Sequence, residues 1–158
     1  MAGPAKSRPR TGSRVAAVQA LFQSEQSGDN AETVIDQFIR HRLGVVPGEL
    51  TFEDGRVPDA EVPLFASIVR AAVRQQDTID AMLTEALPSD WPLNRIDPVL
   101  RAALRAGGAE LAMSGGAPPK VVINEYVDVV QGFLTGAEPG LANAVLDKMA
   151  RLLRPEGF

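Results

Sequence analysis

The sequence predicts an all-α protein of about seven helices in two small packed helical bundles. Three observations support this prediction. Apolar residues recur at helical spacing in the segments between Pro and Gly breaks. No segment keeps the alternating pattern of a half-buried strand. The 158 residues are 45% hydrophobic and 23% charged, which is enough for a core of ordinary globular composition.

The chain opens with a basic segment, and we expect residues 1–12 to form a flexible arm. Gly and Pro residues in this arm favour irregular backbone. The net charge of the whole chain is −4, yet basic residues alone precede its first acid, Glu25. They are Lys6, Arg8, Arg10 and Arg14. A cationic arm on an acidic body can reach phosphates that the body repels, although a solubilising tail has the same composition.

Two helices are expected next, in what we take to be a single domain over residues 13–158. The first runs from Ser13, a candidate N-cap, to about Ser27. Asp29, with Glu32 three residues later, resembles a capping box for a second helix that ends near Leu43. Their inward faces are expected to carry Val15, Val18, Leu21 and Phe22, then Val34, Ile35, Phe38 and Ile39.

A long acidic surface loop is expected over about residues 44–63, between two helical subdomains, and a flexible insertion without function is the favoured interpretation of it. Two apolar stripes follow it, and Pro88 ends the second. The stripes are Leu64, Phe65, Ile68, Val69, Ala72 and Val73, then Ile79, Met82, Leu83 and Leu87.

Proline and glycine mark the last three helices. Asp97-Pro98 is the clearest helix start in the chain, because Asp97 can cap and Pro98 suits the first helical position. That helix should stop at Gly115-Gly116, and close approach by a neighbouring helix would offset the cost of Gly107 and Gly108 inside it. The other two helices begin at Pro118-Pro119 and near Pro139. Their inward residues are expected to be Val122, Tyr126, Val129, Val130 and Phe133, then Leu141, Val145, Leu146, Met149, Leu152 and Leu153.

The composition argues against an enzyme and against a membrane protein. There is no cysteine, His41 is the single histidine, and no nucleotide-binding or nucleophile motif occurs. Glu125 and Asp128 are spaced to share a cation, but a solvated helix face is the favoured interpretation. No apolar run approaches the roughly 18 residues that span a bilayer. We therefore expect no catalytic residue, metal or cofactor, and a cytoplasmic location.

Three stretches together carry a family resemblance. Residues 13–23 read SRVAAVQALFQ, residues 119–124 read PKVVIN and continue as EYVDVVQGF, and residues 141–148 read LANAVLDK before Arg154-Pro155. Their order and spacing closely resemble the NusB family of transcription antitermination factors, with its P-x-x-V-x-I-N-E and V-N-G-V-L-D-K patterns. The match extends from about Arg14 to Pro155 and leaves only the loop near residues 44–63 poorly aligned.

This resemblance implies an all-helical, non-enzymatic protein that binds boxA RNA together with NusE, a protein of the small ribosomal subunit. Such a heterodimer joins the RNA polymerase antitermination complex and supports processive transcription of ribosomal RNA operons. Some relatives self-associate, so a homodimer of the free protein is compatible with the family. A NusB-like interaction module in another RNA-processing or RNA-modification system is the alternative.

The resemblance also implies site residues. The family's arginine-rich start, its basic residue at the P-x-K-V stretch and its F-V-N-G segment assign RNA contacts to Lys6, Arg8, Arg10, Arg14, Lys120, Leu141 and Asn143. NusE-facing positions of the family correspond to Phe22, which is often tyrosine, and to Leu100, which is acidic in some relatives. Leu141 replaces an aromatic and so removes base stacking there. Arg101 and Arg105, four residues apart, are expected to lie on a solvated face.

Overall fold

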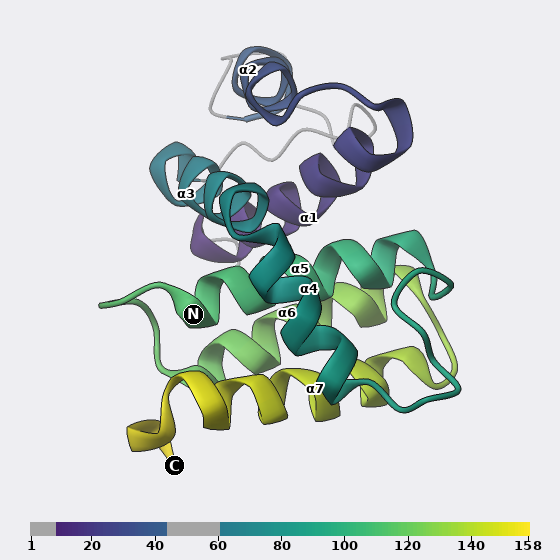
Figure 1. Cartoon of the computed structure of the whole chain (residues 1–158). Helices are drawn as coiled ribbons and strands as arrows, with labels where there is room; N and C mark the ends of the chain where they lie inside the picture. Colours follow the sequence, from purple (N-terminus) through teal and green to yellow (C-terminus); the bar gives the residue numbers. More distant parts are fainter. Residues whose placement is uncertain (1–8, 44–60) are drawn as a thin grey trace, which may run out of the picture. The chain divides into compact units, whose positions relative to one another are not determined.

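The computed structural model describes residues 9–43 and 61–158, and these form seven α-helices with no strand among them (Figure 1). The all-α prediction is therefore confirmed. The chain divides into two compact units, residues 1–70 and 71–158. The helices are α1 (Pro9–Ser27), α2 (Ala31–His41), α3 (Val62–Arg74), α4 (Gln76–Ala86), α5 (Pro98–Ala112), α6 (Pro119–Phe133) and α7 (Glu138–Leu153), followed by the 3-10 helix η2 (Pro155–Gly157).

The first helix begins earlier than predicted. α1 starts at Pro9, whose fixed φ suits a helix start, so Arg10 lies in the first turn and not in an irregular arm. Ser13 is therefore inside the helix and is not its N-cap. Its buried hydroxyl donates to the backbone oxygen of Glu61 at 2.8 Å and accepts from the backbone N–H of Glu61 at 2.7 Å. This pair of bonds fixes the residue that precedes α3 against α1.

The cap of α2 is Asn30 and not the predicted Asp29. The Asn30 side chain accepts from the backbone N–H groups of Glu32 at 2.7 Å and Thr33 at 3.3 Å. Gly28, with φ +80°, ends α1 in the left-handed conformation and so shifts the start of α2 by one residue. α2 also ends at His41, two residues before the predicted Leu43.

The apolar contacts of the first unit centre on α2 and α3. The rings of Phe38 and Phe65 stack with centroids 5.6 Å apart. Val34, Ile35 and Phe38 are buried as predicted, whereas Ile39 is exposed. In α3, Val73 is likewise exposed. Helix α1 is enclosed on more sides than its predicted stripe implies, because Ala16, Ala17 and Ala20 are buried beside Val18 and Leu21. The part of the predicted 44–63 loop up to residue 60 lies outside the described residues, and Val62-Pro63 already belong to α3.

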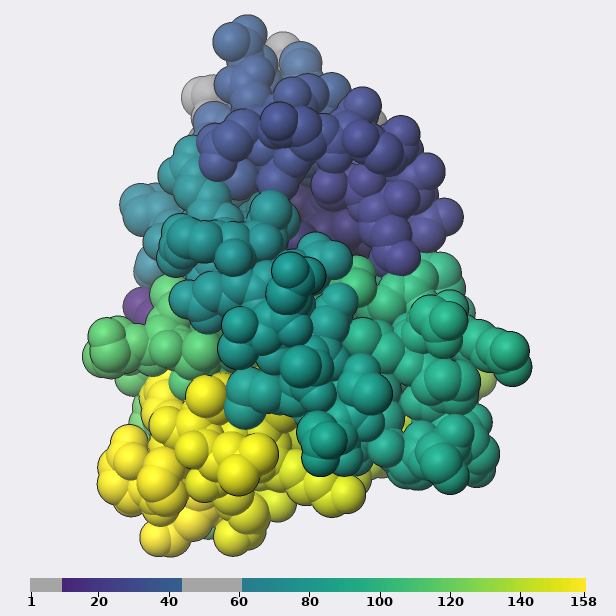
Figure 2. All heavy atoms as spheres, in the orientation of Figure 1, coloured from purple at the N-terminus to yellow at the C-terminus, as the bar shows by residue number. Residues whose placement is uncertain are grey.

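The second unit is built on three mutually packed helices. α5, α6 and α7 contact one another, and α4 packs on α5 and α7. The space-filling view shows side chains of α4 directly against those of α7 (Figure 2). The predicted Asp97 cap is confirmed, since its carboxylate accepts from the Val99 N–H at 2.7 Å. α5 ends at Ala112, a few residues before the predicted Gly115. The predicted inward residues Phe133 and Leu152 are exposed, because each lies in the last turn of its helix.

Gly107 and Gly108 lie where α5 meets its neighbours. A Cβ at Gly107 would be 3.1 Å from the Leu146 side chain, and one at Gly108 would be 2.9 Å from Met149 Cε. The close approach predicted at these glycines is therefore made by side chains of α7 and not by its backbone. Tyr126 crosses the same core and donates from its hydroxyl to buried Glu110 at 2.9 Å.

Arg154 binds the carboxyl end of α5. Its guanidinium donates to the backbone oxygens of Glu110 at 3.1 Å, Leu111 at 2.9 Å, Met113 at 2.9 Å and Ala117 at 2.8 Å. The last carbonyls of a helix have no partner within the helix, and the helix dipole there favours a cation. One side chain at the end of α7 thus stabilises both the end of α5 and the connection to α6.

Replacing Arg154 should destabilise the second unit. We expect Arg154→Ala to lower the free energy of unfolding by about 2 kcal/mol or more, because several carbonyls lose a charged donor. Urea unfolding followed by the fluorescence of Trp91, the single tryptophan, measures this change. The control is Arg151→Ala, which removes an exposed ion pair to Asp147 and should cost about 1 kcal/mol or less. Equal losses in the two variants would contradict this role of Arg154.

The ion pair between α2 and α3 has a pH signature. Arg70 donates two hydrogen bonds to Glu32, at 2.8 and 2.9 Å, and these bonds lower the pKa of Glu32. The stabilisation is present above the ordinary glutamate pKa and is lost as the pH falls through the lowered pKa of the folded state. NMR titration of Glu32 should show that Arg70→Met raises this pKa towards the ordinary value. An unchanged titration would show that Arg70 is not its cause.

Candidate nucleic-acid interface

The basic residues at the start of the chain differ in their surroundings. Lys6 and Arg8 lie outside the described residues. Arg10 is in the first turn of α1 with its side chain 51% exposed, and it pairs with Glu61 at 3.8 Å. No acidic residue lies in that first turn, where the helix dipole disfavours a cation. Among the described residues, Arg10 is therefore held only weakly.

Arg14, one turn later, is only 3% exposed and takes part in interactions within the protein. Its guanidinium is not presented on the surface in the way the RNA-contact prediction requires. The sequence contained one signal of this burial, because the small residues Gly12 and Ser13 precede Arg14 and Ala16 and Ala17 follow it, which allows other parts of the chain to cover the helix.

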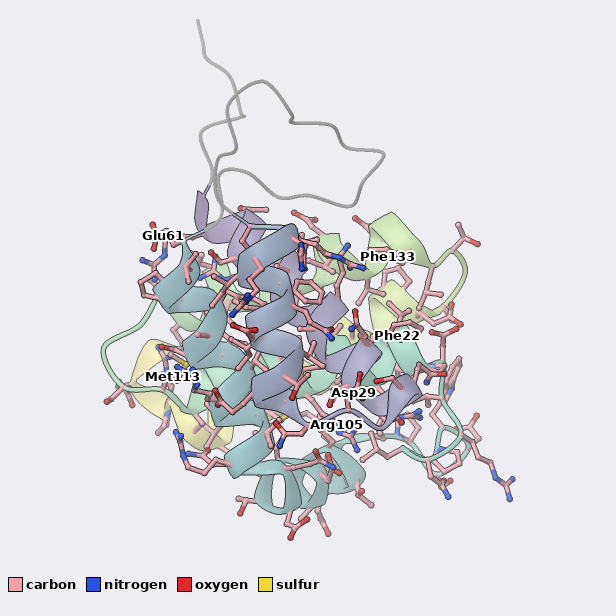
Figure 3. All side chains as sticks on the ribbon, turned by 90° about the horizontal axis from the view of Figure 1, so that it is seen from above. Phe22, Asp29, Glu61, Arg105, Met113 and Phe133 are labelled. Carbon is pink, nitrogen blue, oxygen red and sulfur yellow. The ribbon has the colours of Figure 1, made fainter. Side chains whose placement is uncertain are left out.

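Phe22 lies in the second half of α1 and is partly exposed (Figure 3). Gln19 precedes it by three residues, which places both side chains on one face of the helix. The Gln19 Oε1 atom is buried and has no hydrogen-bond donor. Buried acceptors without a donor are rare in folded proteins. The sequence reasoning passed over Gln19, although the residue stands inside the AVQAL stretch.

Leu100 is fully buried in α5 at 0% exposure. An apolar residue in the first turn of a helix is expected to face the core when the helix is enclosed, and α5 is buried along most of its length. The predicted direct contact of Leu100 with a partner therefore has no exposed side chain to make it.

The remaining predicted residues lie at opposite ends of the α6–α7 pair in the second unit. Lys120 is exposed in the first turn of α6, whereas Leu141 and Asn143 lie in the first turns of α7. α6 and α7 pack as an antiparallel pair, and a helix of 15 residues is about 22 Å long (Figure 1). Pro119, next to Lys120, accordingly lies against Gly157 at the far end of α7. Lys120 and Asn143 therefore cannot hold the same nucleotide.

Asn143 is exposed, and its side chain makes no hydrogen bond within the described chain. It is thus available to a ligand. Leu141 beside it is partly buried, and Phe133 at the end of α6 is 50% exposed (Figure 3). Phe133 is therefore an exposed aromatic that the periodicity had placed in the core.

The expectation of a solvated face for Arg101 and Arg105 is wrong. Arg101 is buried and donates to the backbone oxygens of Leu93 at 3.0 Å and Ile96 at 3.1 Å. Arg105 forms two hydrogen bonds with Asp80 of α4, at 2.9 and 2.8 Å. These partners lie outside α5. The spacing of acidic residues along the helix therefore does not reveal them.

The described residues form neither a metal site nor a membrane span. Within residues 9–43 and 61–158, no three His, Asp or Glu side chains gather closely enough to hold a metal ion. His41 is exposed at the end of α2, and Asp128 is exposed on α6. None of the helices in the described part of the chain is both long and apolar enough to cross a bilayer.

Known proteins resemble this chain over nearly its whole length. The NusB family model matches residues 11–151. The transcription antitermination protein NusB of Granulibacter bethesdensis is 62% identical over 153 residues, which covers 97% of this chain and 94% of the relative. The protein of the same name from Gluconobacter oxydans is 54% identical over 144 residues, covering 91% and 88%.

Solved structures show the same fold. T. maritima NusB superposes with a TM-score of 0.73 at 23% identity and covers 96% of this chain and 98% of its own. The crystal structure of antitermination factors NusB and NusE in complex with dsRNA gives a TM-score of 0.72 at 23% identity, covering 92% and 98%. The family model and the two close relatives agree from α1 to α7, and the chain belongs to the NusB family.

Proposed function

We propose that this protein is a transcription antitermination factor that binds boxA RNA together with NusE. In this role it joins the RNA polymerase antitermination complex and supports processive transcription of ribosomal RNA operons. The observation that carries the proposal is family membership, with relatives 62% and 54% identical that are named transcription antitermination proteins. In this role the protein acts by binding and not by catalysis, and it acts in the cytoplasm.

The RNA side of the proposal rests on exposed cations and amides. Arg10 pairs at 3.8 Å with partly exposed Glu61, Lys120 is exposed with no acid in its turn, and the Asn143 amide is unbonded within the described chain. Lys6 and Arg8 precede Arg10 in the sequence. Phosphates are bound by the cations, whereas Asn143 can bond to a base edge or a ribose hydroxyl of single-stranded RNA.

The NusE side of the proposal rests on α1. Phe22 offers a partly exposed aromatic ring, with Gln19 on the same helical face. Gln23 next to Phe22 is already bonded to Gln37 at 2.9 Å. Aromatic side chains are enriched in protein interfaces.

The direct test is titration of NusE into this protein with and without boxA RNA. If one ligand strengthens the binding of the other, linkage requires that the effect be reciprocal and of the same factor. We expect NusE to raise the affinity for boxA RNA, and boxA RNA to raise the affinity for NusE by an equal factor. A scrambled RNA that gains as much would instead support the alternative, an interaction module of another RNA-processing or RNA-modification system. Failure to bind NusE and boxA RNA, singly or together, would refute the proposal.

The contribution of Arg10 can be measured through salt. For single-stranded RNA, each phosphate contact contributes about −0.7 to the slope of log affinity against log salt. We expect Arg10→Ala to make the slope less negative by about 0.7. The stability should not change, because the 3.8 Å contact of Arg10 with Glu61 is exposed. The control, Arg40→Ala, removes an exposed cation of α2 that pairs with Asp36. A slope that changes equally in both variants would argue against a phosphate contact at Arg10.

Phe22 gives a test of the NusE surface. We expect Phe22→Ala to weaken NusE binding about tenfold or more, because aromatic anchors carry much of the energy of an interface. Phe22→Tyr should retain binding, since the ring is kept. Calorimetry measures both affinities, with Ile39→Ala as a control for an exposed apolar residue of the same unit. If NusE bound the Phe22→Ala and Ile39→Ala variants equally well, the interface would lie elsewhere.

A further inference from the structure

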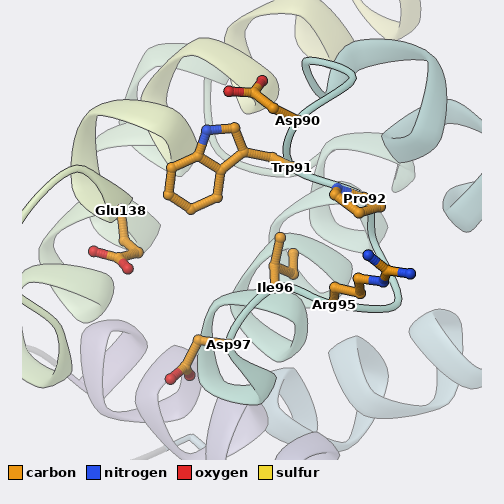
Figure 4. Close-up of a pocket in the computed structure, with 7 residues that line it drawn as sticks. All are labelled: Asp90, Trp91, Pro92, Arg95, Ile96, Asp97 and Glu138. Atoms are coloured by element: carbon orange, nitrogen blue, oxygen red, sulfur yellow. The ribbon is translucent and has the colours of Figure 1, made fainter.

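A cavity of about 480 Å³ lies beside the α4–α5 connection in the second unit (Figure 4). It is lined by Asp90, Trp91, Pro92, Arg95, Ile96, Asp97 and Glu138. Ile96 is buried, and the ring of Trp91 is partly exposed. The cavity therefore combines an aromatic face and an aliphatic base with charged groups around them.

The charges of the cavity are unbalanced. Asp90, Asp97 and Glu138 bring three carboxylates to the lining, Arg95 brings a single guanidinium, and Figure 4 shows Arg95 directed away from the Trp91 ring. Asp97 accepts one bond from the Val99 N–H, whereas Asp90, Glu138 and Arg95 make no ion pair within the described chain. The cavity thus presents negative charge that its own side chains do not neutralise.

The shape and the charge select one kind of occupant. A phosphate or an RNA backbone would be repelled by the carboxylates. A metal ion would need three ligands close together, and the described residues contain no such group. An arginine side chain satisfies each feature, because its methylenes can cover Ile96, its planar cation can lie on an indole ring, and its N–H groups can bond to carboxylates.

We infer that this cavity is a socket for an arginine side chain of the protein partner. The inference rests on the proposed function, in which that partner is NusE. It assigns to the second unit a contact that does not involve Phe22 or Leu100. The acidic socket also helps to separate the two ligands, since it attracts a basic protein segment and repels RNA.

The socket can be tested apart from NusE. Trp91 is the single tryptophan, so incorporation of fluorotryptophan gives one fluorine NMR signal from the cavity. Free argininamide should shift this signal in a saturable manner, and citrullinamide, its neutral analogue, should not. The Asp97→Asn/Glu138→Gln variant should lose the response. Asparagine keeps a capping acceptor for α5, so the fold is retained.

NusE binding tests whether the partner uses the socket. We expect Asp97→Asn/Glu138→Gln to weaken NusE binding about tenfold. The difference from the unaltered protein should be smaller at high salt, because salt screens the charges. The affinity for RNA in the absence of NusE should not be weakened. The charge-matched control is Glu85→Gln/Asp128→Asn, two exposed acids of α4 and α6 outside the cavity.

Three outcomes separate the proposals. A fluorine signal that ignores argininamide overturns the socket. Equal NusE affinity in the socket variant and the control also overturns the inference, while the proposed function stands. If the unaltered protein does not bind NusE, the proposed function is refuted. NusE is then also refuted as the partner that supplies the arginine.

Discussion

The second unit depends on one guanidinium that bonds to the end of another helix. Arg154 follows the last residue of α7, yet its four hydrogen bonds go to carbonyls between Glu110 and Ala117. These carbonyls belong to the last turn of α5 and to the segment that leads into α6. Because one planar cation satisfies them together, the end of α5, the start of α6 and the end of α7 are fixed relative to one another. The position of Lys120 follows from this arrangement.

The core around α5 depends on two glycines that leave room for neighbouring side chains. Gly107 and Gly108 let side chains of α7 approach where a larger residue would meet Leu146 and Met149. Tyr126 uses that space to reach buried Glu110. Lys148, within the LANAVLDK stretch, extends from α7 to the Ala86 carbonyl at the end of α4 at 3.3 Å. A residue of the family motifs therefore helps to hold two helices together.

The charged residues fall into two groups that composition could not separate. Arg101, Arg105 and Arg154 bond to carbonyls or to Asp80 inside the second unit, and Arg14 is buried in the first. Arg10 and Lys120 remain exposed. The cavity beside Trp91, in contrast, is lined by three carboxylates and one guanidinium.

The sequence by itself determined the seven helices, the Asp97 cap and the family, because apolar periodicity, Pro and Gly breaks and motif spacing are local properties. Helix ends were less certain, since Asn30 and Asp29 cap equally well until the turn at Gly28 selects one. Only the tertiary structure decided which arginines are structural and that Leu100 is buried. It also separated Lys120 from Asn143, at opposite ends of an antiparallel helix pair. The reason is physical: partners such as Asp80 for Arg105 or Leu111 for Arg154 stand 25 and 43 residues away, and no pattern along one helix reports them.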